Sequence, residues 1–282
     1  MATFSNQASL RIGGAVTNSN VVTGEITNGI ELAKLAVSAD YGAGESVTYL
    51  VSLRNDTAIP YNDVTVTDDL GAFTLIGGTD LIVPLDYIDG SLVYLVNGVI
   101  SEGLTVLAGP PLSISGINIP AGGTVTLIYE GRVNDLAPLA EGSQIINTVN
   151  AGLCESQIAT ATVAVRSESQ LSIAKSVSST VVTDCELAYT FVIQNTGNAA
   201  VVATDNLIVS DVFTPILKNI EVTLDGVTLE EGVGYTYDEL TGVFSTTEGA
   251  IAVPAATYTR DPATGVVTIT PGSVVLTVSG TV

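Results

Sequence analysis

The sequence predicts an all-β fold of two tandem sandwich modules, and three observations support this prediction. Short runs of alternating apolar and polar residues recur along the chain, for example at 47–53, 64–67 and 124–129. Turn dipeptides such as Asn97-Gly98 and Asp225-Gly226 separate the runs, and no sustained helical period occurs. The chain has 282 residues, enough for two domains that each bury a core. Strands of this length and spacing are typical of immunoglobulin-like sandwiches.

The composition suits half-buried sheets and excludes several classes of partner. Hydrophobic residues make up 46% of the chain and charged residues only 13%, so long disordered segments are not expected. The formal net charge is −21, from 8 basic and 29 acidic residues. Such a surface repels nucleic acid and anionic membranes, and no apolar stretch reaches the length of a membrane span. We therefore expect no nucleic-acid partner and no membrane insertion.

The absence of histidine bears on catalysis. Histidine is the commonest general acid or base and the commonest metal ligand, so Ser-His-Asp and Cys-His arrangements are excluded. The sequence also shows no phosphate-binding glycine loop and no metal-ligand spacing. It therefore predicts a protein that is not an enzyme and that uses no cofactor.

The order of segments in the first half of the chain is repeated in the second half. Residues 32–37 match 173–178, residues 47–55 match 187–195, residues 64–68 match 207–211, and residues 120–127 match 270–276. The repeat divides the chain into an N-terminal extension at 1–28, a first sandwich module at 29–166 and a second at 167–282.

The repeated motifs resemble a bacterial surface module. The second copy carries Lys175-Ser176, Tyr-x-Phe-x-Ile-x-Asn-Thr-Gly-Asn at 189–198 and Val-x-Asp at 209–211, and the first adds Ile-x-Asn-Thr at 145–148. This order resembles the bacterial surface repeat known as domain of unknown function 11, over about residues 30–166 and the first part of 170–282. The resemblance implies immunoglobulin-like stalk modules on cell-surface and spore-associated proteins.

The second copy has no counterpart of the segment that closes the first. The first module continues to a closing segment at 145–151 and a further run at 159–165, whereas Val282 aligns near Val133. A sandwich without such strands exposes unpaired backbone groups and an apolar groove. We therefore expect the second module to lack its closing strands.

The N-terminus carries a candidate for the absent segment. Residues 4–10 read like the closing segment of the first module. The spacing agrees as well, because Asn6 precedes Lys34 by 34 − 6 = 28 residues and Asn147 precedes Lys175 by 175 − 147 = 28. If the linker geometry repeats, Asn6 closes the module that precedes Lys34, and that module belongs to another copy.

The N-terminal segment is therefore predicted to be a donor strand. Its proposed polymerisation residues are Phe4, Asn6, Ala8, Leu10 and Ile12. A head-to-tail contact of this kind does not close on itself, so it propagates into a fibre. The alternative is that residues 1–28 form a loose tail.

Lysine, aspartate and asparagine recur in the same order in both copies. The candidate isopeptide sites are Lys34, Asp68 and Asn147 in the first module, and Lys175 and Asp211 with Asn6 in the second. A desolvated lysine can attack an asparagine carboxamide while a buried acid transfers protons. The alternative is that the lysines lie exposed at strand ends and the asparagines cap turns.

Two smaller sets of residues leave alternatives open. Cys154 and Cys185 permit one disulfide, or they remain unpaired and buried. Acidic clusters either bind calcium or are solvated loops, because none matches a calcium-binding motif. The clusters are Asp63, Asp68 and Asp69; Asp86 and Asp89; and Glu230, Glu231, Asp238 and Glu239.

These observations predict a structural subunit of an extracellular bacterial fibre, either a pilus-like or a spore-surface appendage. Its expected partners are other copies of itself, joined head to tail by N-terminal strand donation. The alternative is a monomeric surface adhesin or stalk fragment that binds a ligand through its loops. No signal peptide is visible at the N-terminus, so either removal of a leader or release from a lysed mother cell accounts for export.

Overall fold

The computed structural model describes residues 2–26, 29–75, 80–153, 157–178 and 185–282. Strands account for almost all regular structure in these residues, and one short 3₁₀ turn, η1 (Ala203–Asp205), is the exception. The structure confirms the all-β, tandem immunoglobulin-like sandwich fold that the sequence predicts. No helix among the described residues is long and apolar enough to cross a bilayer.

The strands group into two compact units. The first comprises residues 1–137 and 145–163, and the second comprises residues 138–144 and 164–282. The N-terminal extension thus groups with the first sandwich, and the short segment at 138–144 groups with the second.

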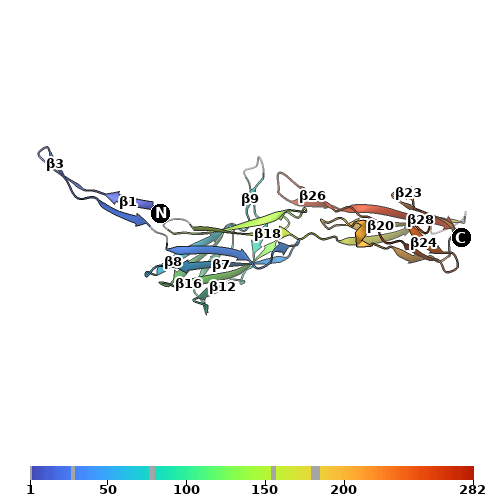
Figure 1. Cartoon of the computed structure of the whole chain (residues 1–282), viewed down its shortest axis with the longest axis horizontal. Coiled ribbons are helices and arrows are strands. Elements are labelled where there is room, and N and C mark those ends of the chain that lie inside the picture. The colour runs from blue at the N-terminus through green and yellow to red at the C-terminus, as the bar shows by residue number, and fades with distance from the viewer. Residues whose placement is uncertain (1, 27–28, 76–79, 154–156, 179–184) are drawn as a thin grey trace. The chain divides into compact units, whose positions relative to one another are not determined.

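The first unit contains two six-stranded sheets (Figure 1). One runs β13 (Val99–Ser101), β12 (Val93–Val96), β16 (Thr124–Val133), β7 (Ser46–Asn55), β5 (Ile30–Ala36), with β11 (Leu85–Tyr87) also paired to β16. The other runs β14 (Thr105–Leu107), β15 (Leu112–Ile119), β8 (Tyr61–Asp68), β17 (Gln144–Ala151), β18 (Gln157–Val165), β6 (Asp40–Tyr41). A small separate pair joins β9 (Phe73–Thr74) to β10 (Leu81–Ile82).

The alternation of the sequence sets which face of each strand is buried. β7 and β16 pair over nine positions, and in both strands every second side chain is buried. The core therefore contains Val47, Tyr49, Val51 and Leu53 from β7 and Val125, Leu127, Tyr129 and Val133 from β16. This period-two burial is the pattern from which the sequence predicts a sandwich.

The second unit contains a five-stranded sheet, a three-stranded sheet and a separate hairpin (Figure 1). The larger sheet runs β19 (Leu171–Val177), β20 (Glu186–Asn195), β28 (Gly272–Thr281), β22 (Lys218–Leu224), β23 (Val227–Thr228). The smaller runs β21 (Ser210–Val212), β25 (Val243–Thr246), β24 (Tyr235–Asp238), and the hairpin pairs β26 (Thr257–Arg260) with β27 (Val267–Thr270). The core between the two sheets includes Phe191, Phe213, Phe244, Leu276 and Val278.

A buried asparagine at the same turn marks both units as versions of one fold. Asn55 Nδ2 donates a hydrogen bond to the Pro120 carbonyl over 2.9 Å, and Asn195 Nδ2 donates one to the Pro254 carbonyl over 3.1 Å. The sequence match places Pro271 opposite Pro120, but the structure places Pro254 there. The reason is that the β26–β27 hairpin is inserted between this proline and β28.

The N-terminal extension is a two-stranded ribbon and not a loose tail. β1 (Ala2–Asn6) pairs with β4 (Val22–Ile26), and β2 (Ser9–Ile12) pairs with β3 (Ala15–Asn18). The ribbon reverses at Gly13-Gly14, where both residues have positive φ angles that favour glycine. All residues from 3 to 23 are exposed, so the ribbon presents both of its faces to solvent. The predicted single donor strand is thus one arm of a hairpin.

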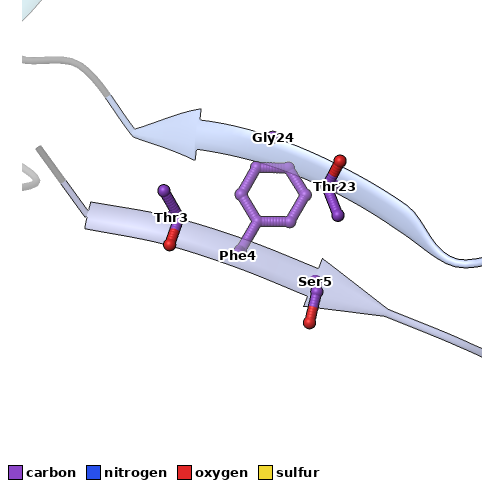
Figure 2. A pocket seen from close by; sticks show the side chains of 5 residues that line it. All are labelled: Thr3, Phe4, Ser5, Thr23 and Gly24. Carbon is purple, nitrogen blue, oxygen red and sulfur yellow. The ribbon is translucent and has the colours of Figure 1, made fainter.

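Phe4 is held in place by a glycine on the opposite arm of the ribbon. Phe4 and Gly24 are cross-strand neighbours, and Figure 2 shows the ring lying over Gly24. A Cβ atom at position 24 would lie 2.5 Å from two ring atoms, so a larger residue there would displace the ring. The glycine therefore provides the space that Phe4 occupies, and the ring remains 49% exposed.

Candidate functional sites

Lys34 lies on β5 with its ammonium group inside the first sandwich. Its side chain is 0% exposed, and that of Asp68 at the end of β8 is 2% exposed. Lys34 Nζ donates a hydrogen bond to Asp68 Oδ2 over 2.5 Å. Burial lowers the pKa of Lys34, although the nearby charges of Asp68 and Asp69 act in the opposite direction. The alternative that this lysine lies exposed at a strand end is therefore wrong.

Two tyrosines that the sequence analysis did not single out enclose the Lys34–Asp68 pair. Tyr49 lies opposite Tyr129 in the sheet, with ring centroids 5.9 Å apart. Lys34 Nζ lies 4.7 Å from the Tyr49 ring centroid, and the Tyr129 hydroxyl donates a hydrogen bond to Asp68 Oδ2. Desolvation raises the pKa of both hydroxyls. Both tyrosines occupy inward positions of alternating runs, which was the signal available in the sequence.

Asn147, on β17, brings its carboxamide into the same buried region. Its side chain is fully buried, and its Oδ1 accepts a hydrogen bond from the Gly71 backbone N–H over 3.2 Å. Asn147 Nδ2 and the neighbouring Tyr49 Oη are close enough to influence each other, yet neither has a well-formed hydrogen bond within the described part of the chain. A buried amide nitrogen without a partner is costly, so this nitrogen requires an explanation.

Lys175 and Asp211 repeat the ion pair in the second unit, but there it is accessible to water. Lys175 Nζ donates a hydrogen bond to Asp211 Oδ2, and the two side chains are 41% and 20% exposed. The ammonium lies 4.5 Å from the ring centroid of Tyr189 and 5.4 Å from those of Phe191 and Phe213. The second site thus keeps the aromatic surroundings of the first, but it is not shielded from solvent as the first site is.

The exposure of β19 shows what is lacking around Lys175. All seven residues of β19 are exposed, whereas β5, the matching strand of the first unit, buries Ile30 and Lys34. Leu171 is 41% exposed, while Ile30 at the matching position is 3% exposed. The apolar residues of β19 therefore line a surface that the corresponding part of the first unit covers.

The second sheet of each unit identifies the strand that provides this cover. β8 has a partner on each side, namely β15 and β17. Its counterpart β21 pairs with β25 on one side, and no described strand lies along its other edge. β21 therefore presents an open edge at the position that β17 occupies in the first unit.

The N-terminal ribbon has the residue pattern of β17. The buried residues of β17 are Ile145, Asn147, Val149 and Ala151. In the shared register, 145 − 4 = 141, the matching positions are Phe4, Asn6, Ala8 and Leu10. Leu10 and the last proposed donor residue, Ile12, are 70% and 78% exposed. Polymerisation through these residues stays a prediction, because only the single chain is described.

Asn6 is not joined to Lys175 and Asp211 in the single chain by any hydrogen bond among the described residues. It instead pairs through its backbone with Val22 in the ribbon. The first triad is thus assembled from one chain, whereas the second has its lysine and aspartate together and its asparagine on an exposed hairpin.

The described residues form neither a disulfide nor a calcium site. Cys185 is exposed, so the alternative of buried cysteines is wrong for this residue, and Cys154 lies outside the described residues. No group of three or more His, Cys, Asp or Glu side chains within the described ranges could hold a metal ion. Asp68 is instead engaged by Lys34, and Asp69 accepts hydrogen bonds from the Gly71 and Thr148 backbone.

Comparisons with known proteins give low-identity likenesses only. No family model matches the chain, so the resemblance to the bacterial surface repeat stays a prediction, and no curated protein matches either. Among solved structures, BcpA, the major pilin subunit of Bacillus cereus, is 13% identical, with 96% of this chain and 73% of that chain covered and a TM-score of 0.38. SpaD, the major pilin of Corynebacterium diphtheriae, is 12% identical, with 85% and 58% covered and a TM-score of 0.36.

The pilus backbone protein RrgB of Streptococcus pneumoniae is 13% identical, with 86% of this chain and 56% of that chain covered and a TM-score of 0.32. At such identities, no residue of this chain acquires a role from these proteins. The roles discussed below depend on the geometry of the two units alone.

Proposed function

We propose that the protein is a non-enzymatic structural subunit of an extracellular bacterial fibre, pilus-like or on a spore surface, built from surface-repeat modules. The N-terminal ribbon of one copy closes the second sandwich of the next by adding to the open edge of β21. This contact joins two different surfaces and does not close on itself, so it propagates into a filament.

The difference between β8 and β21 is the observation that carries the proposal. The first unit has a strand on each side of β8, whereas β21 has one described partner. An unpaired edge beside an exposed apolar strand favours a further strand. The ribbon contains the sequence pattern of β17, which fills the equivalent position in the first unit.

The register of the first unit predicts how the ribbon pairs with its acceptor. β17 places Val149 opposite Asp68 and Ala151 opposite Val66. Transferred to the second unit, this register places Ala8 opposite Asp211 and Leu10 beside Val209. Each buried apolar side chain of leucine size contributes about 1.5–3 kcal/mol, and each net backbone hydrogen bond about 0.5–1.5 kcal/mol. A few of each suffice for a durable contact.

Electron microscopy and sedimentation of the purified full-length chain test this function. We expect filaments, together with species larger than the monomer that resist mild denaturant. Deletion of residues 2–26 should leave a folded monomer, because residues 3–23 are exposed and none of them belongs to the buried core of either unit. A wild-type chain that stays monomeric at all concentrations would contradict the proposal and favour the surface adhesin.

We further propose that Lys34 and Asn147 form an internal isopeptide bond in the first unit. The neutral Lys34 Nζ attacks Asn147 Cγ, the Cγ–Nδ2 bond breaks, and one ammonia leaves while Asp68 transfers the protons. Two observations support this bond. Burial lowers the pKa of Lys34, and the atom that leaves is the amide nitrogen that has no hydrogen-bond partner among the described residues.

Intact mass spectrometry tests the internal bond. In the Asn6→Ala chain, which forms no bond between copies, the mass should be lower than the sequence mass by one ammonia, and addition of Asn147→Ala should abolish this loss. Trypsin should leave residues 12–54 linked to residues 133–166, because the modified Lys34 is no longer cleaved. An unlinked pair of peptides from the folded wild-type chain would contradict the bond.

A further inference from the structure

The geometry of the second unit points to a covalent bond between subunits. We propose that Lys175 of one copy forms an isopeptide bond with Asn6 of the next, with Asp211 transferring the protons. This inference rests on the proposed head-to-tail contact, because the site is incomplete until another copy supplies the asparagine.

Two of the three residues of the site, Lys175 and Asp211, are already in contact in the single chain. Lys175 Nζ donates a hydrogen bond to Asp211 Oδ2 and lies over the ring of Tyr189. Lys34 makes the same hydrogen bond to Asp68 and lies over the ring of Tyr49. In the first unit, the strand that pairs with β8 carries the asparagine to this position.

The donor ribbon carries an asparagine in the matching position. Asn147 lies two residues before Val149, the β17 residue that pairs with Asp68. Asn6 lies two residues before Ala8, the residue expected opposite Asp211. Side chains two residues apart lie on the same face of a strand, so Asn6 and Ala8 share one face. With Ala8 opposite Asp211, the Asn6 side chain therefore points towards Lys175.

Closure of the acceptor also supplies the environment that the reaction needs. The Lys175 side chain is 41% exposed in the single chain, so water keeps its ammonium solvated. Addition of the ribbon would cover β19 with Phe4 and Leu10 and exclude this water. The bond is therefore expected only after the copies associate, and a monomer should not react.

The reaction conserves atoms without any cofactor. The Lys175 ammonium gives one proton to the Asp211 carboxylate, and the neutral Nζ then attacks Asn6 Cγ. The resulting tetrahedral centre expels Nδ2 as ammonia, which receives its protons from the lysine nitrogen through Asp211. One Cγ–Nζ bond forms, one Cγ–Nδ2 bond breaks, and no electron donor or acceptor is required.

Two complementary variants of the full chain test whether the bond forms between copies. Asn6→Ala retains Lys175 but lacks the carboxamide, and Lys175→Ala retains Asn6 but lacks the amine. Each alone should dissociate to monomers on boiling in SDS, whereas an equal mixture should give covalent dimers and nothing larger. The wild-type chain should give a ladder, and Asn20→Ala and Lys218→Ala should behave like the wild type.

Peptide mapping locates the bond and separates the two proposals. The band of the mixture should contain residues 1–11 joined to residues 167–218, lighter by one ammonia than the sum of the two peptides. Filaments of Asn6→Ala that fall apart in SDS, beside a wild-type ladder, support both proposals. Wild-type filaments that dissociate into monomers in SDS would overturn the proposed crosslink but would still support the proposed fibre function. A joined peptide recovered only from monomers would show that the ribbon closes its own chain and would overturn the crosslink between copies.

Discussion

At the scale of single residues, Lys34 shows how one interior accommodates a charged group. Its ammonium has a carboxylate partner and lies over an aromatic ring, and the carboxylate also accepts a hydrogen bond from Tyr129. Removing one member of such a buried group leaves the others without compensation. The same chemistry in the second unit is partly solvated, so the two lysines form a matched pair for mutation.

In an Asn147→Ala background, where no isopeptide bond forms, Lys34→Ala should destabilise the first unit by about 3–5 kcal/mol, because it leaves a buried carboxylate without its cation. Lys175→Ala should change the stability of the monomeric second unit by less than about 1 kcal/mol, since its ion pair is exposed. Urea unfolding followed by circular dichroism measures both. Equal effects of the two substitutions would show that the difference in burial between the two lysines does not change the free energy of unfolding.

The pKa of Tyr129 predicts a loss of stability in alkali. The folded-state pKa lies well above the ordinary value of 10.0, so the folded chain keeps a proton that the unfolded chain releases above that pH. The stability is therefore complete below pH 10.0 and falls as the pH rises further. Tyr129→Phe should lose about 1.5–3 kcal/mol at neutral pH and show a weaker alkaline dependence.

The control for this pH experiment is Tyr61→Phe, which removes one half-buried tyrosine from the same unit. Thermal unfolding from pH 7 to pH 11 gives the comparison. A Tyr129→Phe chain with the same alkaline slope as the wild type would contradict the assignment.

The sequence predicts the candidate isopeptide residues better than their surroundings. Lys34, Asp68 and Asn147 stand out because lysine, aspartate and asparagine recur in the same order in both copies, and the structure brings these three into one buried region. Tyr49 and Tyr129 do not stand out, because inward aromatic residues on strands are usually ordinary core. The pairing of β7 with β16 places the two tyrosines opposite each other, and the structure then shows Tyr49 beside Lys34 and Tyr129 bound to Asp68.

At the scale of elements, the ribbon and the inserted hairpin show the limits of pattern matching. The match of residues 4–10 to β17 identifies a strand but does not reveal that it pairs with β4. Similarly, β26 and β27 lie inside the turn that the sequence match treats as continuous. Alternation predicts that a strand exists, whereas the choice of its neighbour depends on contacts far apart in the sequence.

The alternation of β2 predicts a difference between its two faces. Leu10→Asp places a charge on the face expected to contact the acceptor core, so it should abolish filaments without unfolding the monomer. Ser9→Asp adds the same charge to the other face and should leave assembly nearly unchanged. Sedimentation of both variants beside the wild type measures this. Equal loss of assembly would indicate that the ribbon does not dock in this register.

At the scale of the whole molecule, the excess of acidic residues opposes association. Each copy carries a formal net charge of −21, so copies that approach one another repel. This charge also keeps exposed strand edges from pairing at random. Specific assembly must therefore overcome a general repulsion.

Added salt should speed assembly. At about 0.1 M ionic strength the screening length is about 10 Å, which removes most repulsion between distant surface charges. The initial rate of light scattering should rise several-fold between low salt and this concentration. The Leu10→Asp chain, measured under the same conditions, is the negative control. A rate that falls with added salt would indicate that attraction between opposite charges drives the contact.

The equal spacing of Asn6 to Lys34 and of Asn147 to Lys175 has a mechanical consequence. With both isopeptide bonds formed, tension along a filament enters at Asn6, crosses from Lys34 to Asn147 and leaves through Lys175. The backbone between Lys34 and Asn147 then carries no tension, because the isopeptide bond connects its two ends. Residues 176–282 follow Lys175 and also carry none. A pulled filament should then be loaded only along residues 6–34 and 147–175 of each copy, while the remaining strands of the two sandwiches carry no tension.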